Sequence, residues 1–315
     1  VDAVCDGREV LIGGIMQHIE ACGIHSGDSF AVLPPYKTNP AEIELIQMYT
    51  RRIARALGVV GLLNIQFANY RGVIHVIEIN PRASRTVPFL EKATGVPLTR
   101  IATRCMLGCG LREQGLVAAE VDARVGAQID ADINAEVDAQ ADAEAHAEVA
   151  LPAGRFFVKG PVFPFRRFPR TDHLLGPEMK STGEVMGIGG DFGEAFARAQ
   201  LACGQGLPEA GTVFISVNDH DKDQVLPIAR DLAELGYTLL ATGGTARFLN
   251  GYGLAAAPVA KVGEGTPHIG ELIRGGQVQM VINTPLGKKS RFDESAIRRE
   301  SRALDIPCIT TLSGG

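Results

Sequence analysis

The sequence predicts an α/β and α+β chain in which a mainly antiparallel sheet with helices is followed by a parallel-sheet domain. Residues 64–85, NIQFANYRGVIHVIEINPRASR, alternate apolar and polar side chains on both sides of a turn, as is typical of a β-hairpin. Residues 212–315 instead alternate short β-branched strands with helical segments. Strands connected in this way pair in parallel, so the second pattern predicts a sheet flanked by helices.

Length and composition limit the possible classes of function. The 315 residues suffice for two domains, and a formal net charge of -5 does not indicate nucleic-acid binding. The six cysteines form no CxxC pair, which fits reduced thiols in the cytoplasm. We find no signal peptide and no apolar run long enough to span a membrane. Because Val1 starts within a predicted strand, we interpret the sequence as a fragment of a longer chain.

The first predicted region, residues 1–116, contains strands, a binding loop and helices. Residues 1–19 are expected to form two strands that turn at Asp6-Gly7. The loop Gly23-Ile24-His25-Ser26 follows, and its flexible backbone can turn N–H groups toward a purine edge or a ribose. Apolar residues at helical spacing then predict an amphipathic helix and two short helices. These helices are expected at residues 40–57, 89–93 and 98–109.

The end of the hairpin carries the first candidate site. Because side chains alternate along a strand, Glu78 points with Asn80, and Gln66 lies across from them on the neighbouring strand. These side chains supply oxygen ligands that suit Mg²⁺, whereas the guanidinium groups of Arg82 and Arg85 suit phosphate or carboxylate. The alternative is a surface ion pair between Glu78 and Arg82. So many polar groups at one strand end favour a nucleotide-phosphate site with its metal.

Two segments separate this region from the parallel sheet. Residues 117–153 are rich in Ala, Asp and Glu and have no apolar face to bury, which predicts a disordered insertion. Frayed helix and an acidic binding segment remain alternatives. Residues 154–207 are expected to close the first domain with an irregular edge strand at 155–165 and a helix at 192–203.

The parallel-sheet domain, residues 208–315, carries the second candidate site. In such sheets ligands bind beyond the carboxyl ends of the strands. Thr242-Gly-Gly-Thr245 follows one strand and opens a helix, which makes an anion site, and Lys261 and Asn283 follow the next two strands. We therefore expect a phosphate-binding edge. The strands are predicted at residues 213–217, 237–241, 256–259, 278–282 and 307–310, with helices such as 223–235 and 294–304 between them.

The segments NIQFA, IEINPRASRTVPF, KATGVPL and LLGPEMKSTGEVM resemble the carbamoyl-phosphate synthetase large-subunit family. The resemblance covers residues 1–115 and extends from about 157 to the end. It implies the C-terminal half of an ATP-grasp domain followed by a methylglyoxal-synthase-like allosteric domain. It also implies a ligase that uses ATP with Mg²⁺ or Mn²⁺ to phosphorylate carbamate to carbamoyl phosphate.

The same resemblance implies roles for individual residues. Gly23, Ile24, His25 and Ser26 correspond to contacts with the adenine nucleotide, to which Gln66 and Glu78 also belong. The family's metal ligands correspond to Gln66, Glu78 and Asn80. The residues that contact carbamate or the transferring phosphoryl group correspond to Arg82 and Arg85. The family's residues that bind nucleotide effectors of the UMP or IMP type correspond to Lys222, Thr242, Thr245, Lys261 and Asn283. Pro285 replaces a threonine of some relatives at this second site.

The resemblance also implies partners and limits. The partners would be a glutaminase small subunit and the missing N-terminal part of the large subunit, in pyrimidine and arginine synthesis. Because the family's glycine-rich flap is not in this chain, we expect no turnover by the chain alone. An ornithine site would match His18, Glu20, Asp28 and Thr310, but Gly160 and Cys308 replace a carboxylate and a phenol, so we expect a weak or absent response. The alternatives are a stand-alone nucleotide-binding regulatory module without catalysis, and a methylglyoxal synthase or IMP cyclohydrolase-like enzyme.

Overall fold

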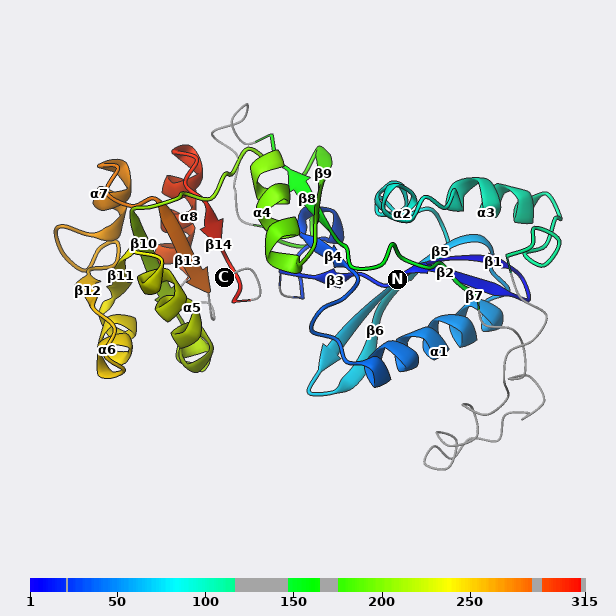
Figure 1. Cartoon of the computed structure of the whole chain (residues 1–315), viewed down its shortest axis with the longest axis horizontal. Coiled ribbons are helices and arrows are strands. Elements are labelled where there is room, and N and C mark those ends of the chain that lie inside the picture. Colours follow the sequence, from blue (N-terminus) through cyan, green and yellow to red (C-terminus); the bar gives the residue numbers. More distant parts are fainter. Residues whose placement is uncertain (21, 117–146, 165–174, 285–290, 313–315) are drawn as a thin grey trace. The chain divides into compact units, whose positions relative to one another are not determined.

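The computed structural model describes residues 1–20, 22–116, 147–164, 175–284 and 291–312 (Figure 1). These residues fall into two compact units: Val1–Gln17 with Leu33–Arg155, and His18–Val32 with Phe156–Gly315. Each unit is considered by itself. Most of the predicted Ala/Asp-rich insertion, residues 117–146, and Pro285 lie outside the described residues.

The first unit is built on a five-stranded sheet with the order β6-β5-β1-β2-β7. Its central strand β1 pairs antiparallel with β2 and β5, β5 pairs antiparallel with β6, and β7 pairs parallel with β2. The buried apolar side chains alternate along β1 and β5, as in Ala3 and Cys5 or Leu63 and Ile65, which gives the sheet its core face. The strands are β1 (Asp2–Asp6), β2 (Val10–Gly14), β5 (Val60–Tyr70), β6 (Val73–Asn80) and β7 (Ala147–Glu148).

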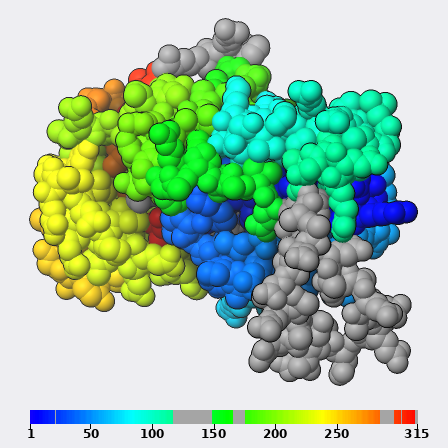
Figure 2. Space-filling view, turned by 45° about the vertical axis from the view of Figure 1, so that its right-hand side comes forward, coloured from blue at the N-terminus to red at the C-terminus, as the bar shows by residue number. Residues whose placement is uncertain are grey.

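Three helices accompany this sheet, with α1 on one face and α2 and α3 on the other (Figure 1). α1 (Pro40–Ala56) begins at Asn39, which forms a capping box with Glu42. α2 (Val87–Thr94) ends at Gly95, which takes a left-handed conformation. α3 (Leu98–Met106) follows, and the α2–α3 segment forms a continuous surface layer of this unit (Figure 2). The predicted helices are therefore present, with ends that differ by a few residues.

The second unit contains a four-stranded sheet with the order β3-β4-β8-β9. Its long hairpin pairs β8 with β9 antiparallel, and α4 packs on both strands. The helix starts at Asp191, whose side chain accepts a hydrogen bond from Glu194 N. The elements are β3 (Gln17–His18), the 3₁₀ turn η1 (Ser26–Asp28), β4 (Ala31–Leu33), β8 (Phe156–Val162), β9 (Gly183–Gly189) and α4 (Phe192–Ala202).

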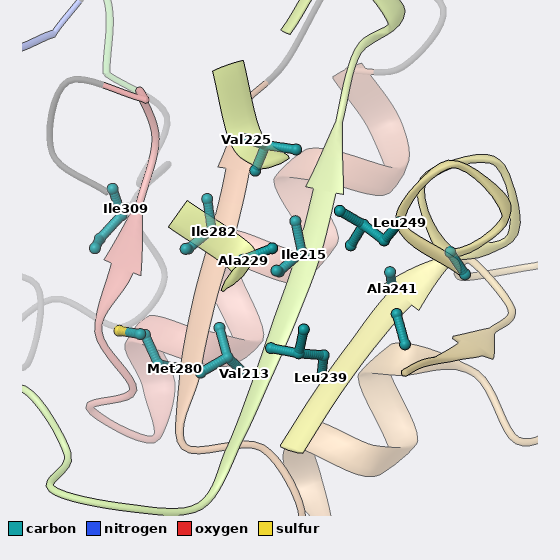
Figure 3. Packing of buried hydrophobic residues seen from close by; sticks show 12 residues of the cluster. Val213, Ile215, Val225, Ala229, Leu239, Ala241, Leu249, Met280, Ile282 and Ile309 are labelled. Carbon is teal, nitrogen blue, oxygen red and sulfur yellow. The ribbon is translucent and has the colours of Figure 1, made fainter. Parts of the chain in front are cut away.

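The rest of the second unit is a parallel sheet with the order β12-β11-β10-β13-β14. One face packs Val213, Ile215 and Ile282 against Val225 and other residues of the flanking helices (Figure 3). The other face buries Phe214 and Val281, as expected when helices cover both sides of a parallel sheet. The elements are β10 (Thr212–Val217), α5 (Lys222–Glu234), β11 (Thr238–Thr242), α6 (Gly243–Gly251), β12 (Ala256–Val259), α7 (Ile269–Arg274), β13 (Met280–Thr284), α8 (Arg291–Ala303) and β14 (Cys308–Ile309). The predicted fold class is confirmed.

Candidate functional site

The β5–β6 hairpin brings the predicted metal ligands together. Its register places Gln66 opposite Glu78 and Asn64 opposite Asn80, so four polar side chains share one end of the hairpin. The turn at the other end is tight because Arg71 and Gly72 both have positive φ angles, 54° and 80°. This turn sets the pairs as far as Phe67 and Val76. A register shift between Gln66 and Phe67 then places Gln66 opposite Glu78, which confirms the expected cross-strand placement of Gln66.

Arg82 is oriented by the end of β6. Its Nη2 donates to Asn80 Oδ1 at 3.1 Å, and its Nη1 donates to the main-chain oxygen of Ala83 at 3.0 Å. The main-chain N–H of Arg82 also donates to Asn80 O at 2.8 Å. Arg82 and Arg85 are both exposed, so their guanidinium groups are accessible to an anion from solvent.

The donor set fits a divalent cation if a ligand supplies the remaining oxygens. Glu78 provides the one carboxylate, and Gln66 and Asn80 provide amide oxygens, which is the type of ligand that Mg²⁺ and Mn²⁺ prefer. Among the described residues there is no group of three or more His, Cys, Asp or Glu side chains that could hold a metal ion. A metal at this hairpin would therefore need further oxygen ligands besides these side chains.

A buried carboxylate beneath the arginine loop was missed by the sequence reasoning. Asp2 is 1% exposed and accepts hydrogen bonds from Asn64 Nδ2 at 2.9 Å, Ser84 Oγ at 2.6 Å and Thr86 Oγ1 at 2.5 Å. Two of these donors come from the loop that contains Arg82 and Arg85. An acidic residue that opens an apolar strand was the available signal, because such a residue needs partners when it is buried.

The predicted adenine-contact loop lies in the second unit. His25 Nδ1 accepts a hydrogen bond from Gly27 N at 3.0 Å, and its own main-chain N–H donates to Gly176 O at 2.8 Å. That N–H is therefore engaged within the protein, contrary to the expectation that it faces a purine or ribose. Gly23 has a φ of 100°, which explains the glycine at this turn. Ile24 and Ser26 are partly exposed.

Asp28 and Lys159 hold this loop against the segment that closes the sheet. Asp28 is fully buried, and its carboxylate accepts hydrogen bonds from Lys180 N and Ser181 N at 2.8 Å each. The buried Lys159 Nζ donates to Ser26 O at 3.0 Å. The main chain around Lys180 is thus bonded to the loop through Asp28, within the second unit.

The second predicted site lies at the carboxyl edge of the parallel sheet. Thr242 ends β11 and Thr245 lies in the first turn of α6, and their hydroxyl oxygens are 3.2 Å apart. Both side chains are buried, and the Thr242 hydroxyl does not cap the helix. A Cβ atom at Gly244 would lie 3.9 Å from Lys222 Nζ, so this ammonium group is close to the helix N-terminus. The helix dipole, two hydroxyls and a cation suit a phosphate group.

Asn283 adds a buried donor to this edge. It lies on β13 beside Ser216 of β10 and is 1% exposed, and among the described residues its Nδ2 has no hydrogen-bond partner. An unpaired buried donor costs roughly 1–3 kcal/mol, so an oxygen from a ligand would be stabilising there. Lys261 follows β12 at the same edge and is partly buried. Lys222 pairs with Asp219 Oδ1 at 2.6 Å and lowers the pKa of that carboxyl.

Three of the residues that match the ornithine pattern line a cavity in the second unit. They are Glu20, Asp28 and Thr310, and Cys308, which departs from the pattern, lines the same cavity. At Gly160, a Cβ atom would lie 2.7 Å from Cys203 Sγ and 2.8 Å from Phe30 Cε1. The space for the carboxylate of the pattern is therefore filled by other side chains.

Comparison with family models shows which classes of domain the chain contains. Residues 6–114 match the family model of the carbamoyl-phosphate synthase L chain, ATP binding domain, and residues 224–310 match the MGS-like domain. The chain thus combines an ATP-binding synthetase domain with a methylglyoxal-synthase-like domain. The first match contains the β5–β6 hairpin and also residues 18–32 of the second unit, and the second match covers most of the parallel sheet.

Curated relatives then identify the family. The chain is 49% identical to the carbamoyl phosphate synthase large chain of Acidobacterium capsulatum, over 99% of this chain and 26% of that protein. It is 47% identical to the large chain of Archaeoglobus fulgidus, over 100% of this chain and 26% of that protein. It is 45% identical to the large chain, C-terminal section, of Aquifex aeolicus, over 100% of this chain and 56% of that protein. The chain belongs to the carbamoyl phosphate synthase large-chain family, of whose full-length members it spans about a quarter.

Hydropathy adds one finding about the helices. Within the part of the chain that the structure describes, none of them combines the length and the apolar character needed to cross a bilayer.

Proposed function

We propose that this chain supplies one half of an ATP site at which carbamate is phosphorylated to carbamoyl phosphate, together with a domain that senses nucleotides. The family match supports ATP use, and the observation that carries the reaction is the hairpin end. There Gln66 lies opposite Glu78, and Arg82 is held next to them by Asn80.

In the proposed reaction a carbamate oxygen attacks the γ-phosphorus of ATP, and the bond to the β,γ-bridging oxygen breaks, releasing ADP. Such transfers depend on positioning and on neutralising charge. Arg82 and Arg85 would bind the carbamate or the transferring phosphoryl oxygens. Gln66, Glu78 and Asn80 would hold Mg²⁺ or Mn²⁺, which when bound screens the charge of the phosphates. Because Asn80 Oδ1 accepts from Arg82, metal binding there would compete with this hydrogen bond.

The remainder of the ATP site would come from elsewhere. Relatives of this chain are much longer, which supports a protein whose other regions complete the site. We expect a glutaminase small subunit to supply ammonia for carbamate formation, in the cytoplasm. The Gly23–Ser26 loop would contribute the contacts to the adenine nucleotide.

The experiment for the catalytic proposal is a chimera. This chain replaces the matching quarter of the Acidobacterium capsulatum large chain, and carbamoyl phosphate formation is measured with the small subunit present. Glu78→Gln and Arg82→Ala should each lower the rate by at least ~100-fold, the size of effect seen when a preorganised charge partner is removed. Glu44→Gln, at an exposed position on α1, should leave it unchanged. A Glu78→Gln chimera with full activity would contradict the proposal.

The second part of the proposal is nucleotide sensing at the edge of the parallel sheet. It is supported by the buried, unpaired Asn283 Nδ2 and by the Thr242–Thr245 pair at the start of α6. Titration calorimetry of this chain with UMP and IMP should show saturable binding that a Thr242→Ala/Lys261→Ala variant loses. Binding by this chain, together with a chimera that forms no carbamoyl phosphate, would favour the alternative of a stand-alone regulatory module. No binding by the folded chain would contradict the sensing role.

A further inference from the structure

We propose that Asp2 is a positioning residue that fixes the loop carrying Arg82 and Arg85 at the end of the hairpin. What the loop binds rests on the proposed function, whereas the positioning itself rests on contacts within the first unit. Asp2 belongs to β1, in the middle of the sheet, and would act on a ligand only through the loop.

The three hydrogen bonds to Asp2 tie the arginine loop to β1 and β5. Asn64 belongs to β5, Ser84 lies midway along the loop, and Thr86 immediately precedes α2. The two hydroxyls also lie 2.7 Å from each other, so the carboxylate, Ser84 and Thr86 form a closed cluster. Hydrogen bonds to an ionised carboxylate are shorter and stronger than neutral ones, and burial strengthens them further.

The Thr86 hydroxyl bonds to Asp2 and does not cap the helix that follows it. A threonine at the position before a helix normally accepts a hydrogen bond from the first turn through its hydroxyl. Here the Thr86 side chain makes no capping bond and instead donates to Asp2 Oδ2. The start of α2 is thereby tied to the sheet through a side chain that is 7% exposed.

These bonds hold the main chain of the loop at several points and leave its two arginine side chains exposed to solvent. Ser84 and Thr86 are tied inward, the main chain of Arg82 is bonded to Asn80, and the side chains of Arg82 and Arg85 remain exposed. Bidentate recognition of a phosphate or carbamate by a guanidinium group depends on its position, and a fixed loop main chain limits the positions that Arg82 and Arg85 can take. Support beneath the ligand-contacting residues decides how accurately they are placed.

The test compares loop order in matched variants of this chain. Thr86→Val removes the hydroxyl at nearly constant shape, Thr86→Ser retains it, and Asp2→Asn removes the charge. Thr50→Val is the control, because Thr50 is also a buried threonine of this unit whose hydroxyl donates to a main-chain oxygen, that of Ile46, at 2.8 Å. Amide hydrogen exchange over residues 80–90 is measured together with thermal unfolding.

We expect Thr86→Val and Asp2→Asn to raise exchange at residues 82–86 at least tenfold, while Thr86→Ser exchanges like the parent chain. Thr50→Val should lower the melting temperature without changing exchange in the loop. Unchanged loop exchange in folded Thr86→Val would overturn the proposal, even if Asp2→Asn fails to fold.

A second measurement links the loop to anion binding. Pyrophosphate is titrated into ¹⁵N-labelled chain, and the Nε–H signals of Arg82 and Arg85 are followed. Thr86→Val should weaken binding several-fold, and Thr86→Ser should restore it. If the loop loosens while the affinity stays the same, the positioning role is overturned. If the parent chain binds no pyrophosphate, the proposed ATP site loses its support, and hydrogen exchange alone still decides whether Asp2 holds the loop.

Discussion

The contact between α4 and β9 leaves no room for a side chain at Gly187, and we predict that Gly187→Ala is strongly destabilising. A Cβ atom there would lie 2.1 Å from Ala195 O and 2.5 Å from Ala199 N. Ordinary van der Waals contact begins at 3.4 Å, so α4 would have to retreat from the strand by about 1.3 Å. The atoms in the way are main chain of the helix, which cannot rotate aside as a side chain can.

The loss of stability follows from the side chains that become less well packed when α4 moves away from the strand. α4 buries Ala195, Phe196 and Ala199 against β8 and β9, and overpacking a core typically costs 1–3 kcal/mol. Because the obstacle is a rigid helix, we expect about 3 kcal/mol, which lowers the melting temperature by roughly 6–12 °C for a unit of this size.

Urea unfolding followed by circular dichroism measures this loss, and Gly183→Ala on the same strand is the control. The nearest atom to a Cβ at position 183 is Val162 Cβ at 3.7 Å, so we expect a change within about 0.5 kcal/mol there. If Gly187→Ala costs less than about 1 kcal/mol, or no more than Gly183→Ala, the close packing inferred for α4 is wrong.

Two further predictions concern His18 and Gly160. Burial, assisted by the nearby Lys159 ammonium, lowers the pKa of His18 from 6.5 to about 4. Below pH 6.5 His18 therefore binds a proton in the unfolded chain but stays neutral in the folded chain. The free energy of unfolding that depends on neutral His18 is complete above pH 6.5 and is lost as the pH falls toward 4. The stability lost between neutral and acidic pH should be about 1–3 kcal/mol smaller in His18→Gln than in the parent chain, as measured from urea midpoints at the two pH values. An equal loss in both proteins would refute the role given to His18. Gly160→Glu should lower the melting temperature without creating an ornithine response, since Cys203 Sγ occupies the space, and ornithine-dependent stabilisation of this variant would show that reasoning to be mistaken.

The hairpin was predictable because its determinants are local. Alternating side chains and a turn at Arg71-Gly72 predict the two strands and place Gln66 near Glu78. The exact pair also depends on a register shift between Gln66 and Phe67, which the sequence pattern does not indicate. The parallel sheet was predictable for a similar reason, since its short strands and helices alternate regularly. Thr242 and Asn283 then fall at the same edge because parallel strands end on one side.

What could not be predicted depends on contacts between distant parts of the chain. Asp2 bonds to residues 62, 82 and 84 positions away, and Lys159 bonds to Ser26 across 133 positions. Periodicity and motif spacing contain no information about such pairs. The same holds for the grouping of residues 18–32 with the later half of the chain, and for the main-chain bond that occupies the His25 N–H.

The two candidate sites differ in how much of each is already built by this chain. At the hairpin Glu78, Arg82 and Arg85 are exposed, and Glu78 is the only carboxylate among the predicted metal ligands, so a metal there needs further oxygen ligands from other sources. At the edge of the parallel sheet Thr242, Thr245 and Asn283 are buried, and the Asn283 Nδ2 has no partner in the part of the chain that the structure describes, so a ligand oxygen could provide one. Groups that are desolvated before a ligand arrives lose little on binding, because the cost of burying them was incurred on folding. Nucleotide sensing should therefore survive in this chain by itself, whereas phosphoryl transfer should depend on the remainder of the ATP site.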